Sequence, residues 1–229
     1  MFQLFRDNCD SLLNKEEDVK FVISYIFDFS YYLTKERLCL NLLSRGGNMI
    51  IKKIQLPLQT LSLVAGFMVW VILSALMPFI KEDIQLSANQ VAMATAIPVV
   101  LGSVLRIPIG FWTNKFGARK LFFSSFLFLL FPVYFISIAD SYTDLLIGGL
   151  FVGIGGAIFS VGVTSLPKYY PRERHGFVNG IYGVGNLGTA LTTFTAPVIA
   201  AQFGWQPTVK FFMILLILFA FLNFFLGDK

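Results

Sequence analysis

One arginine interrupts a long stretch of the chain that carries no other charge. Arg106 is the single charged residue between Ile84 and Asn114. An arginine inside a membrane span costs about 2.5–3.5 kcal/mol on insertion scales, so it usually faces a cavity or a partner and marks a functional site. The planar fork of guanidinium donors suits an oxyanion. Alternatively, the side chain snorkels, because Arg106 lies only about 10 Å from a helix end near Thr113. Spacing alone leaves both readings open.

A polar stripe within residues 176–201 is the second candidate. At about 100° per residue, five polar side chains fall within about 80° of one another on a helix: Asn179, Tyr182, Asn186, Thr189 and Thr193. One polar stripe on an apolar helix is typical of a helix that lines a wet cavity. Beside it, Gly176, Gly180 and Gly183 form a smooth stripe, and small residues let helices approach closely.

Motifs for catalysis or metal binding are lacking in the sequence. It has no Walker phosphate-binding motif and no Ser, His and Asp set with catalytic spacing. Cys9 and Cys39 lie far apart without a Cys or His companion, and the single histidine is His175, so neither a disulfide nor a metal site has support. We therefore expect no enzyme and no cofactor. The charge-free stretches also lack an Asp or Glu that could relay protons.

The composition indicates which solvent surrounds these residues. Hydrophobic residues make up 56% of the chain and charged residues 14%, with a mean hydropathy of +0.72. Soluble domains carry about a quarter charged residues. Since there is too little polar surface to face water on all sides, lipid must be the solvent for much of the chain.

Charge-free stretches divide residues 49–229 into predicted spans. Ile54–Ile80 has no charge for 27 residues, which is enough to cross about 30 Å of hydrocarbon at about 1.5 Å per residue. The stretch after His175 is too long for one helix, and Gln202–Pro207 breaks it. The sequence therefore predicts an all-α, polytopic membrane protein with six transmembrane helices: Ile54–Ile80, Ile84–Asn114, Leu121–Ala139, Leu145–Pro167, Gly176–Ala201 and Thr208–Leu226.

The connecting loops differ in charge from one side to the other. Four acids and two bases, Lys81 and Lys210, lie on one side, with nine bases and two acids on the other. The positive-inside rule puts both ends of the six-span body in the cytoplasm. Because this explains the pI of about 9.2, we expect no nucleic-acid partner. The nine bases are Lys52, Lys53, Lys115, Arg119, Lys120, Lys168, Arg172, Arg174 and Lys229.

Residues 1–48 form a polar leader with 6 Lys/Arg and 7 Asp/Glu, against 12 and 6 in residues 49–229. Phe21–Leu33 is apolar but too short to span a bilayer, and it fits either an interfacial helix or a disordered leader. A second reading is that the leader is not translated naturally. Arg45–Met49 can be encoded by a purine-rich run before an ATG, which resembles a bacterial ribosome-binding site and would start the protein at Met49.

A loop motif follows Arg106 at the predicted turn between spans two and three. Gly110-Phe-Trp-Thr-Asn114-Lys115-Phe-Gly117-Ala-Arg119-Lys120 resembles the loop of the major facilitator superfamily, a Gly, then Asp-Arg/Lys, then Gly and two basic residues. Asn114 stands where the family has its usual acid, so the charge pairing attributed to that acid cannot form in the same way. The resemblance implies a structural or gating role for Gly110, Asn114, Lys115, Gly117 and Arg119.

Spans four and five carry a more specific resemblance. They read Gly153-Ile-Gly155-Gly156-Ala-Ile-Phe159 and Gly180-Ile-Tyr-Gly183-Val-Gly185-Asn186-Leu-Gly188. This is similar to the nitrate/nitrite porter family, whose signature in span five has this Gly-x-Gly-Asn-x-Gly core. The likeness covers nearly all of residues 55–227. It implies the N-terminal six-helix half of a major facilitator fold, which transports nitrate or nitrite across a bacterial cell membrane.

The resemblance also implies which residues bind the anion. Arg106 occupies the motif position of the family's anion-binding arginine, and Phe159 that of an aromatic residue in span four. On the polar stripe, Asn186, Asn179 and Tyr182 are the candidates. Gly180, Gly183, Gly185 and Gly188 are assigned to packing and gating. From the residues alone, helix packing would explain Phe159 and most of these glycines equally well.

A second half is implied as well. Major facilitator transporters have twelve spans, and alternating access needs two bundles around a midplane site. The partner would be a separately encoded C-terminal half or a second copy of this chain; otherwise the chain is the product of a truncated gene. We expect truncation or splitting rather than transport by this chain alone. The rival readings are a major facilitator half for another small organic anion and a non-transporting accessory or structural membrane protein.

Overall fold

The computed structural model describes residues 47–228, and that part of the chain is helical with short connections and no strand. Sequence predictions for residues 1–46 lie outside the described residues. The helices are α3 (Gly47–Trp70), α4 (Ile72–Asp83), α5 (Ala88–Phe116), α6 (Ala118–Ser137), α7 (Tyr142–Val152), α8 (Ile154–Ala157), α9 (Phe159–Ser165), η1 (Leu166–Tyr169), η2 (Arg172–Arg174), α10 (His175–Gly183), η3 (Val184–Asn186), α11 (Leu187–Phe203) and α12 (Trp205–Leu226).

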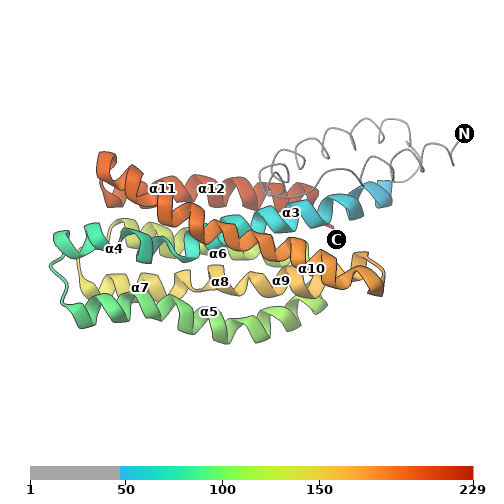
Figure 1. Ribbon diagram of the computed structural model, residues 1–229, viewed down its shortest axis with the longest axis horizontal. Coiled ribbons are helices and arrows are strands. Elements are labelled where there is room, and N and C mark those ends of the chain that lie inside the picture. The colour runs from blue at the N-terminus through green and yellow to red at the C-terminus, as the bar shows by residue number, and fades with distance from the viewer. Residues whose placement is uncertain (1–46, 229) are drawn as a thin grey trace, which may run out of the picture. The chain divides into compact units, whose positions relative to one another are not determined.

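These helices group into six segments long and apolar enough to cross a membrane, which confirms the predicted number. No boundary differs from the prediction by more than about four residues, a usual error for helix ends. The chain is thus a multi-pass membrane protein, and Figure 1 shows its spans running back and forth along one axis. The spans are Ile54–Asp83, Ala88–Phe116, Ala118–Ser137, Tyr142–Tyr169, Arg172–Phe203 and Trp205–Leu226.

Capping and turn residues fix two span ends that the pattern of charged residues did not predict. Span two begins at Ala88 rather than Ile84 because Ser87 and Gln90 form a capping box. The Ser87 N–H donates to Gln90 Oε1 (2.9 Å), and the Gln90 N–H donates to Ser87 Oγ (3.4 Å), which satisfies two otherwise unpaired donors. Between spans five and six, Gly204 has a φ of +85°. Glycine adopts this conformation at no steric cost, so the chain turns within the predicted break.

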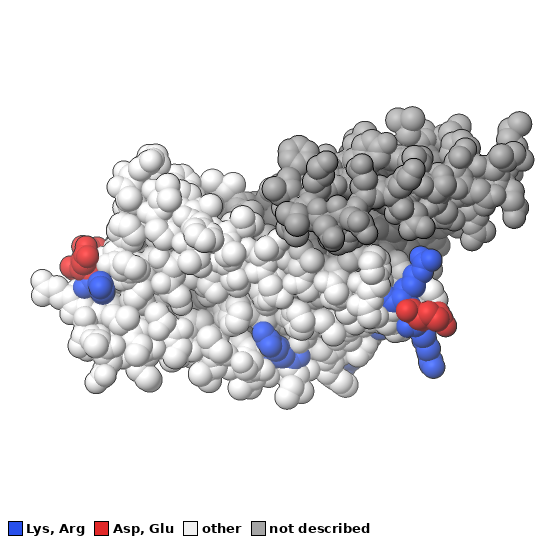
Figure 2. Space-filling view, viewed as in Figure 1, with Lys and Arg blue, Asp and Glu red and all other residues white. Residues whose placement is uncertain are grey.

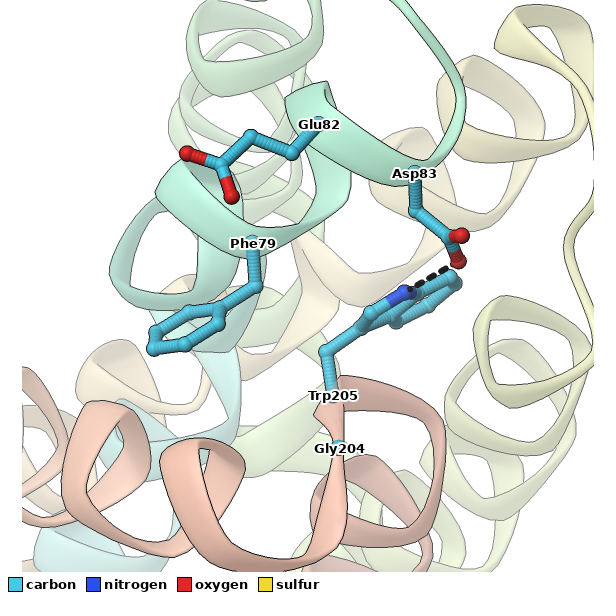
Figure 3. A pocket seen from close by; sticks show the side chains of 5 residues that line it. All are labelled: Phe79, Glu82, Asp83, Gly204 and Trp205. Carbon is cyan, nitrogen blue, oxygen red and sulfur yellow. Dashed lines mark hydrogen bonds between the residues drawn. The ribbon is translucent and has the colours of Figure 1, made fainter.

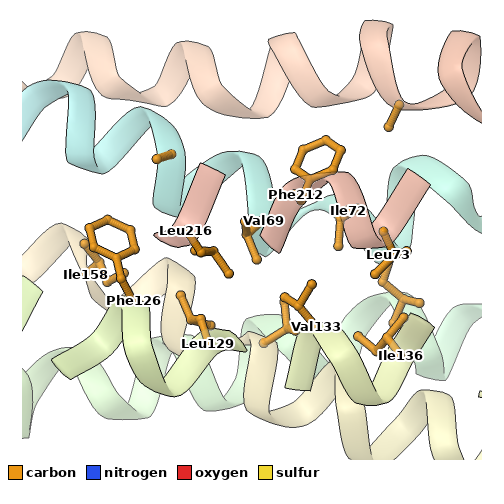
Figure 4. Packing of buried hydrophobic residues seen from close by; sticks show 14 of the residues in the cluster. Val69, Ile72, Leu73, Phe126, Leu129, Val133, Ile136, Ile158, Phe212 and Leu216 are labelled. Atoms are coloured by element: carbon orange, nitrogen blue, oxygen red, sulfur yellow. The ribbon is translucent and has the colours of Figure 1, made fainter. Parts of the chain in front are cut away.

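The core lies between α6, α12 and span one. Apolar side chains of these helices pack with Ile158 of span four at 6% exposure or less (Figure 4). In a bilayer this packing works through van der Waals contact rather than the hydrophobic effect. The labelled members of the cluster are Val69, Ile72, Leu73, Phe126, Leu129, Val133, Ile136, Ile158, Phe212 and Leu216.

Hydrogen bonds between side chains and neighbouring helices join spans one and six. Asn223 is 1% exposed, and its Nδ2–H donates to Ser62 Oγ (2.7 Å). Two turns before Ser62 on span one, Gln55 Nε2–H donates to the carbonyl oxygen of Leu226, about one turn after Asn223 on span six (3.1 Å). Hydrogen bonds of this kind within a bilayer are worth about 1–2 kcal/mol in model peptides. They fix the register of the first and last spans.

The charged side chains lie at the two ends of the bundle. On the face drawn in Figure 2 they gather at both ends, and one basic group interrupts the uncharged band between them. We call one end the basic end, which carries Lys115, Lys120, Lys168, Arg172 and Arg174, and the other the acidic end, which carries Glu82, Asp83, Asp140 and Asp144. Spans one, three and five run from the basic end to the acidic end.

Candidate functional site

Arg106 lies far from either end of its helix, with an intermediate exposure. It stands ten residues before Phe116, the last residue of α5, and thus about 15 Å from the helix end. Its partly buried side chain turns to span four, where Nε–H donates to the Gly156 carbonyl oxygen (3.4 Å) and Cζ lies 5.5 Å from the centroid of the Phe159 ring. The guanidinium therefore contacts the middle of a neighbouring span rather than snorkelling to a helix end.

Irregular backbone in span four creates this contact. The span changes helix at Gly153 and again at Ile158. A Cβ on Gly153 would overlap the Pro98 carbonyl oxygen of span two, and one on Gly155 would lie 2.8 Å from the Gly66 carbonyl oxygen of span one. Because these glycines have no side chain, spans one and two approach span four closely. The backbone around Gly156 thereby comes within reach of Arg106.

Four aromatic residues extend from Arg106 into the bundle, and we call them the aromatic cluster: Phe159, Phe67, Trp70 and Tyr182. The Phe67 ring lies 6.3 Å from Phe159 and 5.1 Å from Trp70, and Phe159 lies 5.7 Å from Tyr182. Trp70 Nε1–H donates to the Pro98 carbonyl oxygen (3.3 Å). Phe67 and Trp70 were not among the predicted site residues, although two aromatics three positions apart near mid-span were a usable signal.

Tyr182 lies behind Phe159 as a fully buried side chain. Its hydroxyl donates to the Ile158 carbonyl oxygen (3.3 Å), and its ring packs where a Cβ on Gly162 would otherwise be. The Tyr182 hydroxyl therefore satisfies the carbonyl oxygen of Ile158, at the break in span four. Tyr182 contacts the ring of Phe159, so it can influence Arg106 through that ring.

The two asparagines of the predicted stripe lie in different surroundings. Asn186 is exposed, and its Nδ2–H donates to the Gly183 carbonyl oxygen (2.7 Å). Asn179 is partly buried, and its Oδ1 is buried without a hydrogen-bond partner in the described part of the chain. The predicted stripe does not form one surface, because the 3₁₀ turn η3 between α10 and α11 has about three residues per turn and shifts the register.

The glycines of span five divide into two groups. A Cβ on Gly185 would lie 2.7 Å from Leu63 Cβ, and one on Gly188 would overlap the Val64 carbonyl oxygen, so both allow close packing on span one. Gly176, Gly180 and Gly183 have no atom within 4 Å of such a Cβ. We call the surface formed by these three glycines the open face of span five.

The loop motif lies at the basic end, away from Arg106. Asn114 and Lys115 are exposed, and Gly117 ends α5 with a φ of +84°, which explains the glycine there. Arg119 lies with Cζ 5.1 Å from the Phe224 ring of span six. Gly110, one turn after Arg106, would bring a Cβ to 3.5 Å from Thr164 Oγ1 of span four.

Within residues 47–228, no carboxylate lies near the level of Arg106. Residues 84–139, 145–172 and 174–227 contain no Asp or Glu, and span one has none before Glu82. Among the described residues, the guanidinium therefore has a carbonyl oxygen and an aromatic ring as neighbours, and neither carries a formal negative charge. This arrangement favours a small anion as the missing counter-ion.

A separate pocket of about 430 Å³ lies at the acidic end (Figure 3). Phe79, Glu82, Asp83, Gly204 and Trp205 line it, and Trp205 Nε1–H donates to Asp83 Oδ2 (2.9 Å). The two carboxylates make this pocket unfavourable for an anion. The hydrogen bond joins the end of span one to the start of span six.

Comparison with known proteins agrees with the geometry. The sequence model of the Major Facilitator Superfamily matches residues 60–229. The chain is 64% identical over 176 residues to the nitrite extrusion protein of Bacillus subtilis (strain 168), which covers 77% of this chain and 45% of that protein. It is 55% identical over 185 residues to the probable nitrate transporter NarT of Staphylococcus carnosus (strain TM300), covering 81% and 46%.

A third relative gives the same picture. The probable nitrate transporter NarT of Staphylococcus epidermidis (strain ATCC 35984) is 58% identical over 175 residues, which covers 76% of this chain and 45% of that protein. The resemblance to nitrate/nitrite porters seen in the sequence is thus confirmed. The chain spans about half the length of the curated relatives it matches.

Proposed function

Because the chain belongs to the Major Facilitator Superfamily, we propose that it is the N-terminal six-helix half of a transporter for nitrate or nitrite. The substrate class comes from the names of its relatives, a nitrite extrusion protein and nitrate transporters. That it is one half follows from the length of the match. The chain matches about 45% of each relative, and transporters of this kind consist of two bundles around a central site.

Arg106 carries the anion-binding part of the proposal. It is a partly buried cation far from the helix ends, at a level where the described residues offer no carboxylate. A charge within a membrane span is costly without a counter-ion, and a small oxyanion would supply that counter-ion. Because Nε is used on Gly156, the two terminal nitrogens are free to bind two oxygens of a planar anion side by side.

The other predicted site residues take supporting roles in this proposal. Phe159 forms a flat wall beside the guanidinium. Asn186 is exposed and is the candidate for a second direct donor to the anion. Tyr182 holds Phe159 from behind through ring contact and need not touch the substrate itself.

We place the protein in a bacterial cell membrane, with the basic end in the cytoplasm. The charge difference between the two ends supports this orientation through the positive-inside rule. Both ends of the six-span body would then be cytoplasmic, because the number of spans is even.

A second six-helix bundle would cover the open face of span five. Gly176, Gly180 and Gly183 have no neighbour there, and small residues are typical of close helix contacts in membranes. The large apolar side chains that are exposed elsewhere on spans five and six suit lipid. The covering bundle is either a C-terminal half or a second copy of this chain, and the remaining length of the relatives favours the C-terminal half.

Reconstitution tests the function. Proteoliposomes would contain this chain, the unmatched remainder of the Bacillus subtilis relative, or both, and uptake of ¹⁵N-nitrate would be measured by mass spectrometry. We expect uptake only with both. Arg106→Lys should lower it by about 10–100-fold, because an ammonium lacks the two-pronged, charge-assisted contact worth about 1.5–3 kcal/mol. The matched control is Arg172→Lys at the exposed basic end, which should leave uptake unchanged.

Two results would contradict the proposal. Equal uptake by the pair with and without Arg106→Lys would remove the anion site at Arg106. Competition by excess formate but not by nitrite would instead indicate a half-transporter for another small organic anion.

A further inference from the structure

A buried glutamine in span one has one free end. Gln59 is 1% exposed, and the Ser165 hydroxyl of span four donates to its Oε1 (2.7 Å). In this bond the Oε1 end of the amide faces the serine. Nε2 is then left buried, with no acceptor within the described residues. Buried amide hydrogens without an acceptor are rare in folded proteins.

An asparagine in span five has a buried acceptor that lacks a donor. Asn179 Oδ1 is buried and has no donor in the described part of the chain. The two unpaired groups are therefore complementary, since one lacks an acceptor and the other lacks a donor. They are also the only two buried side-chain nitrogen or oxygen atoms among the described residues that lack a hydrogen-bond partner.

The register of the helices brings the two groups to the same layer. Span one and span five run in the same direction and are in contact, with Leu63 against Gly185 and the Thr192 hydroxyl donating to the Met68 carbonyl oxygen (2.9 Å). Gln59 lies four residues before Leu63, and Asn179 six residues before Gly185. At about 1.5 Å per residue, their levels along the bundle differ by about 3 Å when counted from the contact of Leu63 with Gly185, and by about 6 Å when counted from the bond of Thr192 to Met68.

Packing places span four in the same layer. Leu166 and Val178, the chain neighbours of Ser165 and Asn179, belong to one buried cluster together with Leu63. Spans one, four and five therefore pack together at about the level of Gln59 and Asn179.

We propose that Gln59 and Asn179 bind one water molecule between them, so that Ser165, Gln59, the water and Asn179 form a hydrogen-bonded chain across spans four, one and five. Water is the fitting species because it accepts from Nε2–H and donates to Oδ1. An oxyanion only accepts, so it would repel the Asn179 oxygen, and a metal cation would repel the Gln59 amide hydrogens. This assigns Asn179 to a structural contact between helices rather than to the anion site, and it ties three spans into one body near the basic end.

A double-mutant cycle on the purified full chain tests the proposal, with the midpoint of thermal unfolding as the readout. Gln59→Met and Asn179→Leu keep the side-chain volume roughly constant and remove the hydrogen bonds. Each should lower the midpoint by about 3–6 °C, and the double variant should be no less stable than the worse single variant. Asn179→Gln keeps the acceptor on a side chain about 1.5 Å longer and should stay within about 2 °C of the parent.

A matched control is Thr195→Val, which removes an exposed hydroxyl bonded to Leu191 of its own helix. Its effect should add to that of Gln59→Met. If Gln59→Met does not fold, Ser165→Ala replaces it in the cycle and should couple to Asn179→Leu in the same way. The proposal is refuted if either single variant raises the midpoint, or if the effects of Gln59→Met and Asn179→Leu add.

Addition of nitrate separates this water site from the anion site. Nitrate should raise the midpoint equally in the parent chain and in Gln59→Met. Loss of that shift in Gln59→Met alone would mean that Gln59 binds the anion, which overturns the water assignment. Loss of the shift in every protein, the parent included, would count against the nitrate site at Arg106 and leave the double-mutant cycle as the measure of the water site.

Discussion

The same substitution, glycine to alanine, should have opposite effects at two positions of this bundle. In α9, a Cβ on Gly162 would lie 2.6 Å from the Tyr182 hydroxyl oxygen and nearer still to the ring. Carbon atoms pack at about 3.5–4.0 Å, so the methyl group overlaps the Tyr182 ring by more than about 1 Å. In α10, a Cβ on Gly180 would have no atom within 4 Å.

The magnitudes follow from these distances. Overpacking of a filled core costs about 1–3 kcal/mol, and the size of this overlap suggests the upper part of that range. Alanine regains about 0.5–1 kcal/mol over glycine in a helix. Gly162→Ala should therefore lower stability by about 1–2.5 kcal/mol, which corresponds to a fall of about 3–8 °C in the midpoint. Gly180→Ala should gain about 0.5–1 kcal/mol and raise the midpoint by about 1–4 °C.

Thermal unfolding of the purified chain in one detergent measures both variants. Tyr182→Leu in the Gly162→Ala background removes the clash, so the double variant should be more stable than the sum of its single changes. The reasoning is refuted if Gly162→Ala and Gly180→Ala move the midpoint in the same direction, or if Tyr182→Leu gives no relief. A clash at Gly162 should also displace Phe159, since Phe159 contacts Tyr182.

Two further predictions concern the contacts of spans five and six. Asn223→Leu removes the hydrogen bond to span one and should lower stability by about 1–2 kcal/mol, measured as a fall in the same unfolding midpoint; an unchanged midpoint would mean that this bond does not hold the two spans. In a chain with Cys9→Ser and Cys39→Ser, Gly180→Cys should cross-link to a co-expressed C-terminal half that carries cysteines, as read by gel shift. Ile214→Cys, which is 65% exposed on span six, is the control that should not cross-link, and equal cross-linking at both positions would contradict the assignment of the open face.

The position of Arg106 links these tests to the proposed transport. Its guanidinium is held by one weak hydrogen bond at 3.4 Å and by one aromatic ring. Neither contact offers a full negative charge, so an arriving anion would gain a strong, charge-assisted bond. The bound anion would also place a negative charge near the irregular backbone around Gly156, which Arg106 contacts. Under the proposed function, anion binding and the local shape of span four would therefore be coupled through the Arg106 side chain.

The sequence alone showed that lipid surrounds much of the chain, gave the number of spans and identified Arg106 as the candidate anion-binding residue. Each span is long enough and apolar enough to satisfy its own backbone in lipid, so six helices could be counted without any knowledge of their neighbours. Arg106 was identified for the same reason, because a charge in a charge-free stretch is exceptional wherever the helices lie. The loop at Gly204 was likewise a local signal, and the structure has its turn there.

Only the tertiary structure decided which side chains meet. The contact of Arg106 with span four, the aromatic cluster with Phe67 and Trp70, and the burial of Tyr182 all depend on how far each helix is shifted and rotated against the next. A periodic pattern gives the faces of one helix, but a single 3₁₀ turn such as η3 changes them. Gln59 shows the limit most clearly, because its Oε1 accepts from Ser165 of span four, which lies 106 residues further along the chain, and its Nε2 is left buried without a partner among the described residues.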